Sequence, residues 1–174
     1  MVSGAAKSIL TALVLTVLLP LSLAADSKDA WLTTKAKIAL LTADGVKVSS
    51  VNVDTVDGTV TLHGKVRTEA EKEKAVAVVR QVDGVKEVHN LLQVVPDSVK
   101  ETVKVADDAV KEKVEASIKA DKSLEGVKVA SVNNGVVLLS GNAKELDFKL
   151  RAIEAAWSVD GVRQVRSEIQ VEEK

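Results

Sequence analysis

The chain has 174 residues, a formal net charge of −1 and no cysteine. The absence of cysteine excludes disulfide frameworks and thiolate chemistry, and the balanced charge excludes a general attraction to nucleic acid or to an anionic membrane. Binding to a polyanion would therefore need a local cluster of basic side chains.

Residues 1–24 predict a cleavable signal peptide. Lys7 is the one charged residue in this segment, residues 9–23 are mostly apolar, and small residues precede the expected cleavage point after Ala24. The alternative is a membrane anchor, but the apolar run is shorter than the roughly 20 residues that a spanning helix needs. We therefore expect an exported protein whose mature chain begins at Ala25 or Asp26.

Residues 28–95 predict a first domain with the order helix, strand, strand, helix, strand. Asp29 is expected to cap a helix that starts near Ala30. One face of this helix holds Trp31, Lys35, Ile38 and Leu41 or Thr42.

The strands and the second helix of this domain have clear sequence signals. Two strands of alternating pattern flank a tight turn at Asp57-Gly58. A capping box, Thr68 to Glu71, opens the second helix, and Asp83-Gly84 ends it before the last strand.

Residues 96–107 predict a helical linker. Pro96-Asp97 interrupts the chain, and Ser98 to Glu101 has the pattern of another capping box. Apolar residues then keep helical spacing from Val99 to Ile118, which indicates that the linker continues without a break into the next domain.

Residues 108–173 predict a second copy of the first domain. The segment Val82–Val88 recurs 77 positions later as Val159–Val165, and an Asn134-Gly135 turn replaces Asp57-Gly58. The fold class is therefore α+β. We expect two tandem αββαβ units, each a three-stranded mixed sheet with two helices packed on one face, preceded by the cleavable signal peptide.

Six glycines recur at matched positions and are interpreted as structural. Four belong to turns or helix ends, where a left-handed backbone is needed, and two lie inside strands, where close backbone approach or a bulge is expected. They are Gly58, Gly84, Gly135 and Gly161 in the first group, and Gly64 and Gly141 in the second.

No group of residues suggests catalysis, a metal or a cofactor. His63 and His89 are the two histidines, and strand parity predicts that both face away from the core of the first domain into solvent. A metal site needs three or four converging ligands, and a catalytic triad needs a positioned base. Lysine and glutamate are interleaved and aromatic residues are scarce, which disfavours nucleic-acid binding.

The two copies differ on the second helix. Leu146, Leu150, Ile153 and Trp157 occupy positions that in the first copy hold Glu69, Glu73, Val76 and Arg80. We call these four residues the domain 2 stripe. Because the opposite face of the same helix is also apolar, the helix should have two burial partners.

The partner of the domain 2 stripe has two alternatives. The first domain or the linker helix covers it, or it is a docking surface for lipid or for an apolar client segment, flanked by the basic residues Lys144, Lys149 and Arg151. The second copy also has extra apolar residues on its predicted sheet, where Val136 and Leu138 replace Thr59 and Thr61 of the first copy. One of the two surfaces could bind the first copy and leave the other free.

Three segments carry a resemblance to a known family. They are Asp29–Thr33, Asp57–Gly64 and Val82–Asn90, and the second copy matches through Asn134–Gly141 and Val159–Val165. Together they resemble the BON domain, and the signal peptide followed by two such domains resembles osmotically induced periplasmic proteins of Gram-negative bacteria. Lipoprotein members of the family carry a lipobox cysteine, which this chain lacks.

The resemblance implies a location and a class of function. It implies a periplasmic location and offers no catalytic motif. From the residues themselves we expect a soluble monomer that is not an enzyme and needs no cofactor or metal. We expect a binding module that supports envelope integrity under osmotic stress, through a phospholipid surface contacted by domain 2. The alternative is a holdase-like chaperone that binds unfolded or outer-membrane client proteins.

Overall fold

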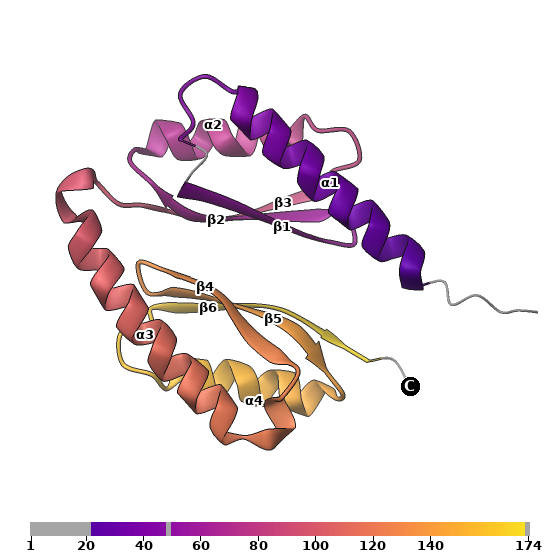
Figure 1. Ribbon diagram of the computed structural model, residues 1–174, viewed down its shortest axis with the longest axis vertical. Helices are drawn as coiled ribbons and strands as arrows, with labels where there is room; N and C mark the ends of the chain where they lie inside the picture. Colours follow the sequence, from indigo (N-terminus) through magenta and orange to yellow (C-terminus); the bar gives the residue numbers. More distant parts are fainter. Residues whose placement is uncertain (1–21, 48–49, 173–174) are drawn as a thin grey trace, which may run out of the picture.

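The computed structural model describes residues 22–47 and 50–172, so most of the predicted signal peptide lies outside the described residues. Each half of the chain folds as helix, strand, strand, helix, strand, as predicted (Figure 1). The first domain consists of α1 (Ser22–Thr42), β1 (Val51–Val56), β2 (Thr59–Val66), α2 (Glu69–Arg80) and β3 (Glu87–Val94). The second consists of α3 (Lys100–Ala120), β4 (Val127–Asn133), β5 (Val136–Ala143), α4 (Leu146–Trp157) and β6 (Gln164–Val171).

Both sheets are mixed, as expected. The strand orders are β1-β2-β3 and β4-β5-β6, with an antiparallel first pair and a parallel second pair in each sheet. A parallel pair requires a crossover, which α2 and α4 provide. The two helices of each domain cover one face of its sheet, as Figure 1 shows.

The hairpin turns follow the sequence prediction. Asp57 and Gly58 have φ values of 53° and 81°, and Asn134 and Gly135 have 49° and 75°. A two-residue turn with positive φ at both positions matches the twist of the flanking strands, and Asp-Gly and Asn-Gly are the pairs that adopt it most readily.

The role predicted for Asp29 is wrong. Asp29 lies inside α1 and does not cap it; its carboxylate accepts hydrogen bonds from the backbone N–H groups of Asp57, at 2.7 Å, and Gly58, at 3.0 Å. Asp107 on α3 does the same for Asn134 and Gly135, at 2.8 and 2.9 Å. In each domain a helix carboxylate therefore fixes the first hairpin turn through long-range contacts.

The core of the first domain uses a different face of α1 from the face that holds Trp31, Ile38 and Leu41. Leu32, Ala36 and Leu40 are buried against the sheet, whereas Trp31, Ile38 and Leu41 point to solvent. Both sets have helical spacing, so periodicity alone does not distinguish them. In the second domain the corresponding core residues of α3 are Val110, Val114 and Ile118.

The helix starts give one confirmed and one incorrect prediction. At α2, Thr68 Oγ1 accepts a hydrogen bond from the Glu71 N–H at 3.1 Å, and the Glu71 carboxylate accepts from the N–H groups of Arg67 and Lys47 at 2.9 and 2.6 Å. The capping box predicted at Ser98 does not form, because residues 97–99 make a 3-10 turn and Val99 precedes α3 without a side-chain cap. The linker does continue into the first helix of the second copy, as expected.

The strand glycines allow close backbone approach. Gly64 has a φ of 129° and Gly141 a φ of 108°. A Cβ atom at either position would overlap a backbone carbonyl oxygen, that of Ser50 in the first domain and that of Gly126 in the second. The close approach predicted for this glycine pair is thus confirmed.

The two sheets face each other and the four helices lie on the outside (Figure 1). Contacts between the domains run mainly from β2 to β4. Leu138, Thr61 and Leu91 are almost completely buried, at 1, 1 and 8% exposure, on sheet faces that point away from their own helices. The second domain therefore covers the outer face of the first sheet.

Candidate functional site

The domain 2 stripe lies uncovered on α4. Leu146, Leu150 and Trp157 are 59, 54 and 56% exposed, while Ile153 is half-buried against the core of the second domain. The second copy also has two apolar residues on its sheet in place of threonines of the first copy. These residues, Val136 and Leu138, are buried, and Leu138 lies between the sheets. Of the two surplus surfaces, the sheet face is thus occupied by the first domain and most of the helix stripe remains accessible.

The charges beside the domain 2 stripe are mixed. Lys144 and Arg151 are exposed and Lys149 is half-buried, but α4 also carries Asp147 and Glu154. Arg151 also forms an ion pair with a carboxylate outside α4, because its Nη1 lies 3.7 Å from Asp121 Oδ2. Electrostatic attraction of an anion to this face is therefore local and modest.

A second exposed apolar surface lies on α1. Trp31, Ile38 and Leu41 are 61, 53 and 67% exposed, and we call them the domain 1 stripe. Helical spacing places the three residues on one face of a helix but does not show whether that face is open. Comparison with α3 would have found it: when Asp29 is aligned with Asp107, the three positions become Ala109, Ala116 and Lys119.

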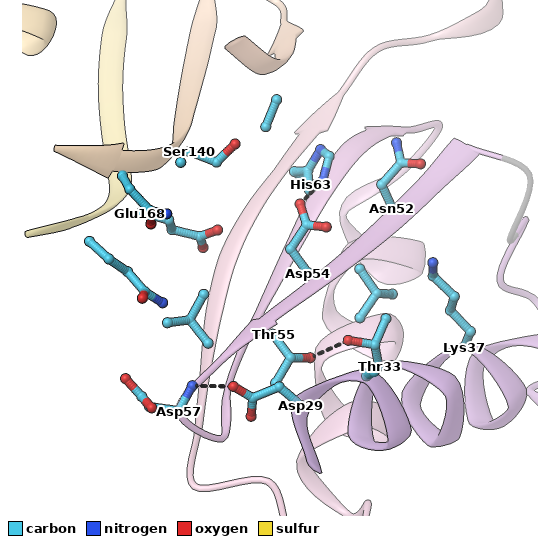
Figure 2. Close-up of a pocket in the computed structure, with 17 residues that line it drawn as sticks. Asp29, Thr33, Lys37, Asn52, Asp54, Thr55, Asp57, His63, Ser140 and Glu168 are labelled. Carbon is cyan, nitrogen blue, oxygen red and sulfur yellow. Dashed lines mark hydrogen bonds and ion pairs between the residues drawn. The ribbon is translucent and has the colours of Figure 1, made fainter. Parts of the chain in front are cut away.

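A cleft of about 980 Å³ separates the two sheets on one side of their contact. Figure 2 shows Asp54 and His63 on the first sheet and Ser140 and Glu168 on the second. His63 Nε2 lies 2.9 Å from the Asp54 carboxylate, and this hydrogen bond holds the pKa of Asp54 below its ordinary value, although partial burial acts in the opposite direction.

The solvent-facing prediction is wrong for His63 and right for His89. His63 does point away from the core of its own domain, but the second domain covers that face and leaves the residue 6% exposed. His89 is exposed and lies 3.2 Å from Glu87. Strand parity correctly predicts the direction in which His63 points. It does not predict that the second domain covers this face.

The opposite side of the contact is closed by an ion pair between the domains. Lys65 Nζ on β2 lies 2.7 Å from the carboxylate of Asp107 on α3, and the two side chains are only 16 and 5% exposed. Two backbone N–H groups also hold the Asp107 carboxylate, so its orientation does not depend on the lysine alone.

Within residues 22–47 and 50–172, no three His, Asp or Glu side chains converge in a way that could hold a metal ion. No helix in the same part of the chain is both long and apolar enough to cross a membrane.

The fold defines a tandem repeat of two small α+β domains, each with the order helix, strand, strand, helix, strand. The BON domain model matches residues 28–96 and 106–173, and the chain belongs to this family. It is 34% identical to osmotically-inducible protein Y of Escherichia coli strain K12 over 146 residues, which cover 82% of this chain and 72% of that protein.

Two solved structures show weak likeness. Both are of CdsD, a structural protein of the type III secretion system of Chlamydia trachomatis. One is its C-terminal domain, with 14% identity and a TM-score of 0.34 over 83% of this chain and 67% of that chain. The other has 13% identity and a TM-score of 0.33 over 80% and 91%.

Proposed function

We propose that this chain is a non-enzymatic periplasmic binding protein that supports envelope integrity under stress, and that its domain 2 stripe docks on a phospholipid surface. The observation that carries the proposal is the exposure of Leu146, Leu150 and Trp157 along one line of α4. The opposite side of this helix already packs on its own sheet, through Ala152 and Ala156. The similarity to an osmotically inducible protein supports a role in stress.

The expected affinity is low. Full burial of a large apolar side chain stabilises by roughly 1.5–3 kcal/mol, so covering three side chains that are about half exposed is worth about 3 kcal/mol. A basic residue near an anionic membrane adds about 1 kcal/mol, but Asp147 and Glu154 offset part of this gain. Docking should therefore be reversible, sensitive to salt and dependent on anionic lipid.

The alternative, a holdase-like chaperone, is favoured by the domain 1 stripe. In Figure 1, α1 and α4 lie on opposite outer sides of the molecule. A flat bilayer can contact one of these helices at a time, whereas an unfolded or outer-membrane client chain can contact both. The exposed domain 1 stripe, which includes Trp31, is the observation that supports this function.

Tryptophan fluorescence separates the two functions. Trp31 and Trp157 are the two tryptophans of the chain, so Trp31→Phe leaves Trp157 as the single reporter. Because Trp157 is 56% exposed, its emission should start red-shifted and move to the blue on addition of anionic vesicles. A shift with a reduced, unfolded polypeptide and none with vesicles would replace lipid docking by client binding.

Matched variants locate the effect on α4. In the Trp31→Phe background, Leu146→Glu with Leu150→Glu should abolish the shift. Val105→Glu is the control, because Val105 is also exposed and apolar, at 68%, but lies on α3 outside both stripes. If vesicles do not move the Trp157 emission, or if the α4 and control variants behave alike, the domain 2 stripe is not the lipid-docking surface.

A further inference from the structure

The sequence repeat makes the two sides of the domain interface comparable. Strand β2 of the first domain corresponds to β5 of the second, and β1 corresponds to β4. The position equivalent to the β2–β4 contact is therefore the one between β5 and β1, where the cleft lies. At residue level, Lys65 on β2 corresponds to Asn142 on β5, and Asp107 on α3 corresponds to Asp29 on α1.

On the closed side, a lysine ammonium fills the site at Asp107. The same carboxylate oxygen, Oδ2, accepts from Lys65 Nζ at 2.7 Å and from the Asn134 N–H at 2.8 Å. Its other oxygen accepts from the Gly135 N–H at 2.9 Å. Asp107 thus binds a primary ammonium with a carboxylate that is oriented in advance by the hairpin turn.

On the open side, the carboxylate is present and the ammonium is missing. Asp29 Oδ2 accepts from the Asp57 N–H at 2.7 Å and Oδ1 from the Gly58 N–H at 3.0 Å, which reproduces the arrangement at Asp107. Asn142 replaces the lysine, and no ion pair within the described residues involves Asp29. The 980 Å³ cleft lies at this position, and both Asp29 and Asn142 line it.

The remaining walls of the cleft suit a cationic donor. Besides Asp29, the cleft is lined by the carboxylates of Asp54, Asp57 and Glu168, whose charge exceeds that of the one lining lysine, Lys37. His63 also lines it. Because the Asp54 carboxylate can only accept, His63 Nε2 is the donor of their hydrogen bond, and in the neutral ring Nδ1 is then an acceptor. This Nδ1 is buried and has no partner in the described structure.

We propose that the cleft is a binding site for a primary alkylammonium group, which pairs with Asp29 as the Lys65 ammonium pairs with Asp107. The ligand class is a linear polyamine or the lysine side chain of a bound polypeptide, since both present the same ammonium on a flexible alkyl chain. The volume of the cleft exceeds that of one ammonium, so its other carboxylates and His63 can receive a second donor group. This site is separate from the domain 2 stripe.

The test uses calorimetry and backbone amide NMR shifts on the mature chain. The ligands are spermidine and the capped tripeptide Ala-Lys-Ala, with Ala-norleucine-Ala as the control that lacks the amine. We expect millimolar or tighter binding of at least one amine ligand, with shifts at the Asp57 and Gly58 amides that Asp29 holds. Binding of spermidine alone identifies a polyamine site, and binding of the tripeptide identifies recognition of a lysine side chain.

Two variants test the position of the site. Asn142→Lys supplies the ammonium that the first copy has at Lys65 and should weaken binding at least tenfold, and Asp29→Asn should do the same by removing the charge. Thr102→Lys adds equal charge on an exposed part of α3 and should leave binding unchanged. The spectrum of each variant checks its fold.

Three results would overturn this proposal. They are no binding of either amine, equal binding of the norleucine peptide, and binding that is unaffected in both cleft variants. Leu146→Glu with Leu150→Glu should leave amine binding intact, so that failure of lipid docking and failure of this site are distinguished.

Discussion

Replacing Lys65 with Asn, the residue of the second copy, should loosen the contact between the domains. The Lys65–Asp107 pair is short, at 2.7 Å, and its side chains are 16 and 5% exposed. Removing one partner of a fully buried pair costs about 3–5 kcal/mol, mostly through the charge that is left behind. Here the carboxylate keeps two backbone donors and water can reach it once the lysine is shortened, so we expect about 2 kcal/mol.

A double-mutant cycle with Asp107→Asn isolates the pair. Urea unfolding of the wild type, Lys65→Asn, Asp107→Asn and the double variant should give a coupling energy of about 1–2 kcal/mol, because the two side chains interact directly. Asp29→Asn is the matched control, since Asp29 fixes the equivalent turn without a lysine; its cost should add to that of Lys65→Asn. Small-angle scattering should show that Lys65→Asn increases the radius of gyration.

One result would refute this reasoning. If the coupling is below about 0.5 kcal/mol and the scattering is unchanged, the pair adds nothing to domain closure. The burial of Leu138 and Thr61 between the sheets would then be sufficient to hold the domains together.

Further predictions concern the helix cap, a glycine, pH and the exposed stripe. Thr68→Ala should lower the free energy of unfolding by about 1 kcal/mol in urea titrations, because it removes the cap of α2. Gly64→Ala should prevent stable folding of the first domain, seen as loss of dispersed amide NMR signals, since its Cβ would overlap the Ser50 carbonyl oxygen at positive φ. Because the hydrogen bond from His63 lowers the pKa of Asp54, its contribution to stability is complete above the ordinary value of 3.8 and is lost as the pH falls through the lower folded value. The stability difference between wild type and Asp54→Asn should therefore shrink in acid; a constant difference would contradict this assignment. Leu150→Glu with Trp157→Arg, the residues of the first copy, should cost less than about 1 kcal/mol by thermal unfolding, because both side chains are more than half exposed.

The local features of the fold could be predicted from the sequence because they rest on neighbouring residues. Asp57-Gly58 and Asn134-Gly135 form the predicted turns, and Thr68 caps α2 as predicted, although the Glu71 carboxylate accepts from the Arg67 N–H and not from that of Thr68. The Ser98 capping box fits the same pattern but fails, since Pro96 is followed by a 3-10 turn and α3 begins only at Lys100. A pattern shows which residues can cap a helix and does not show where the helix begins.

The candidate sites depend on contacts between distant segments, which the sequence pattern reached only in part. Comparing the two copies found the domain 2 stripe, because four polar or smaller positions become large and apolar together. The same comparison does not show whether the domain 2 stripe or the sheet face with Leu138 packs against the other domain. The sequence pattern does not predict the surroundings of Asp29 and His63, because their partners, the hairpin turn and the second domain, lie far along the chain or across the interface.

Helix α3 has a mechanical consequence for the molecule. It is continuous from Lys100 to Ala120, and its second half belongs to the core of the second domain through Val110, Val114 and Ile118. Bending between the domains is therefore expected at residues 96–99, since the Val95 N–H is still bonded to the Val66 carbonyl of the first sheet. A change in the angle between the domains at this hinge would alter both the cleft that Asp29 lines and the Lys65–Asp107 ion pair, because both lie between the two domains.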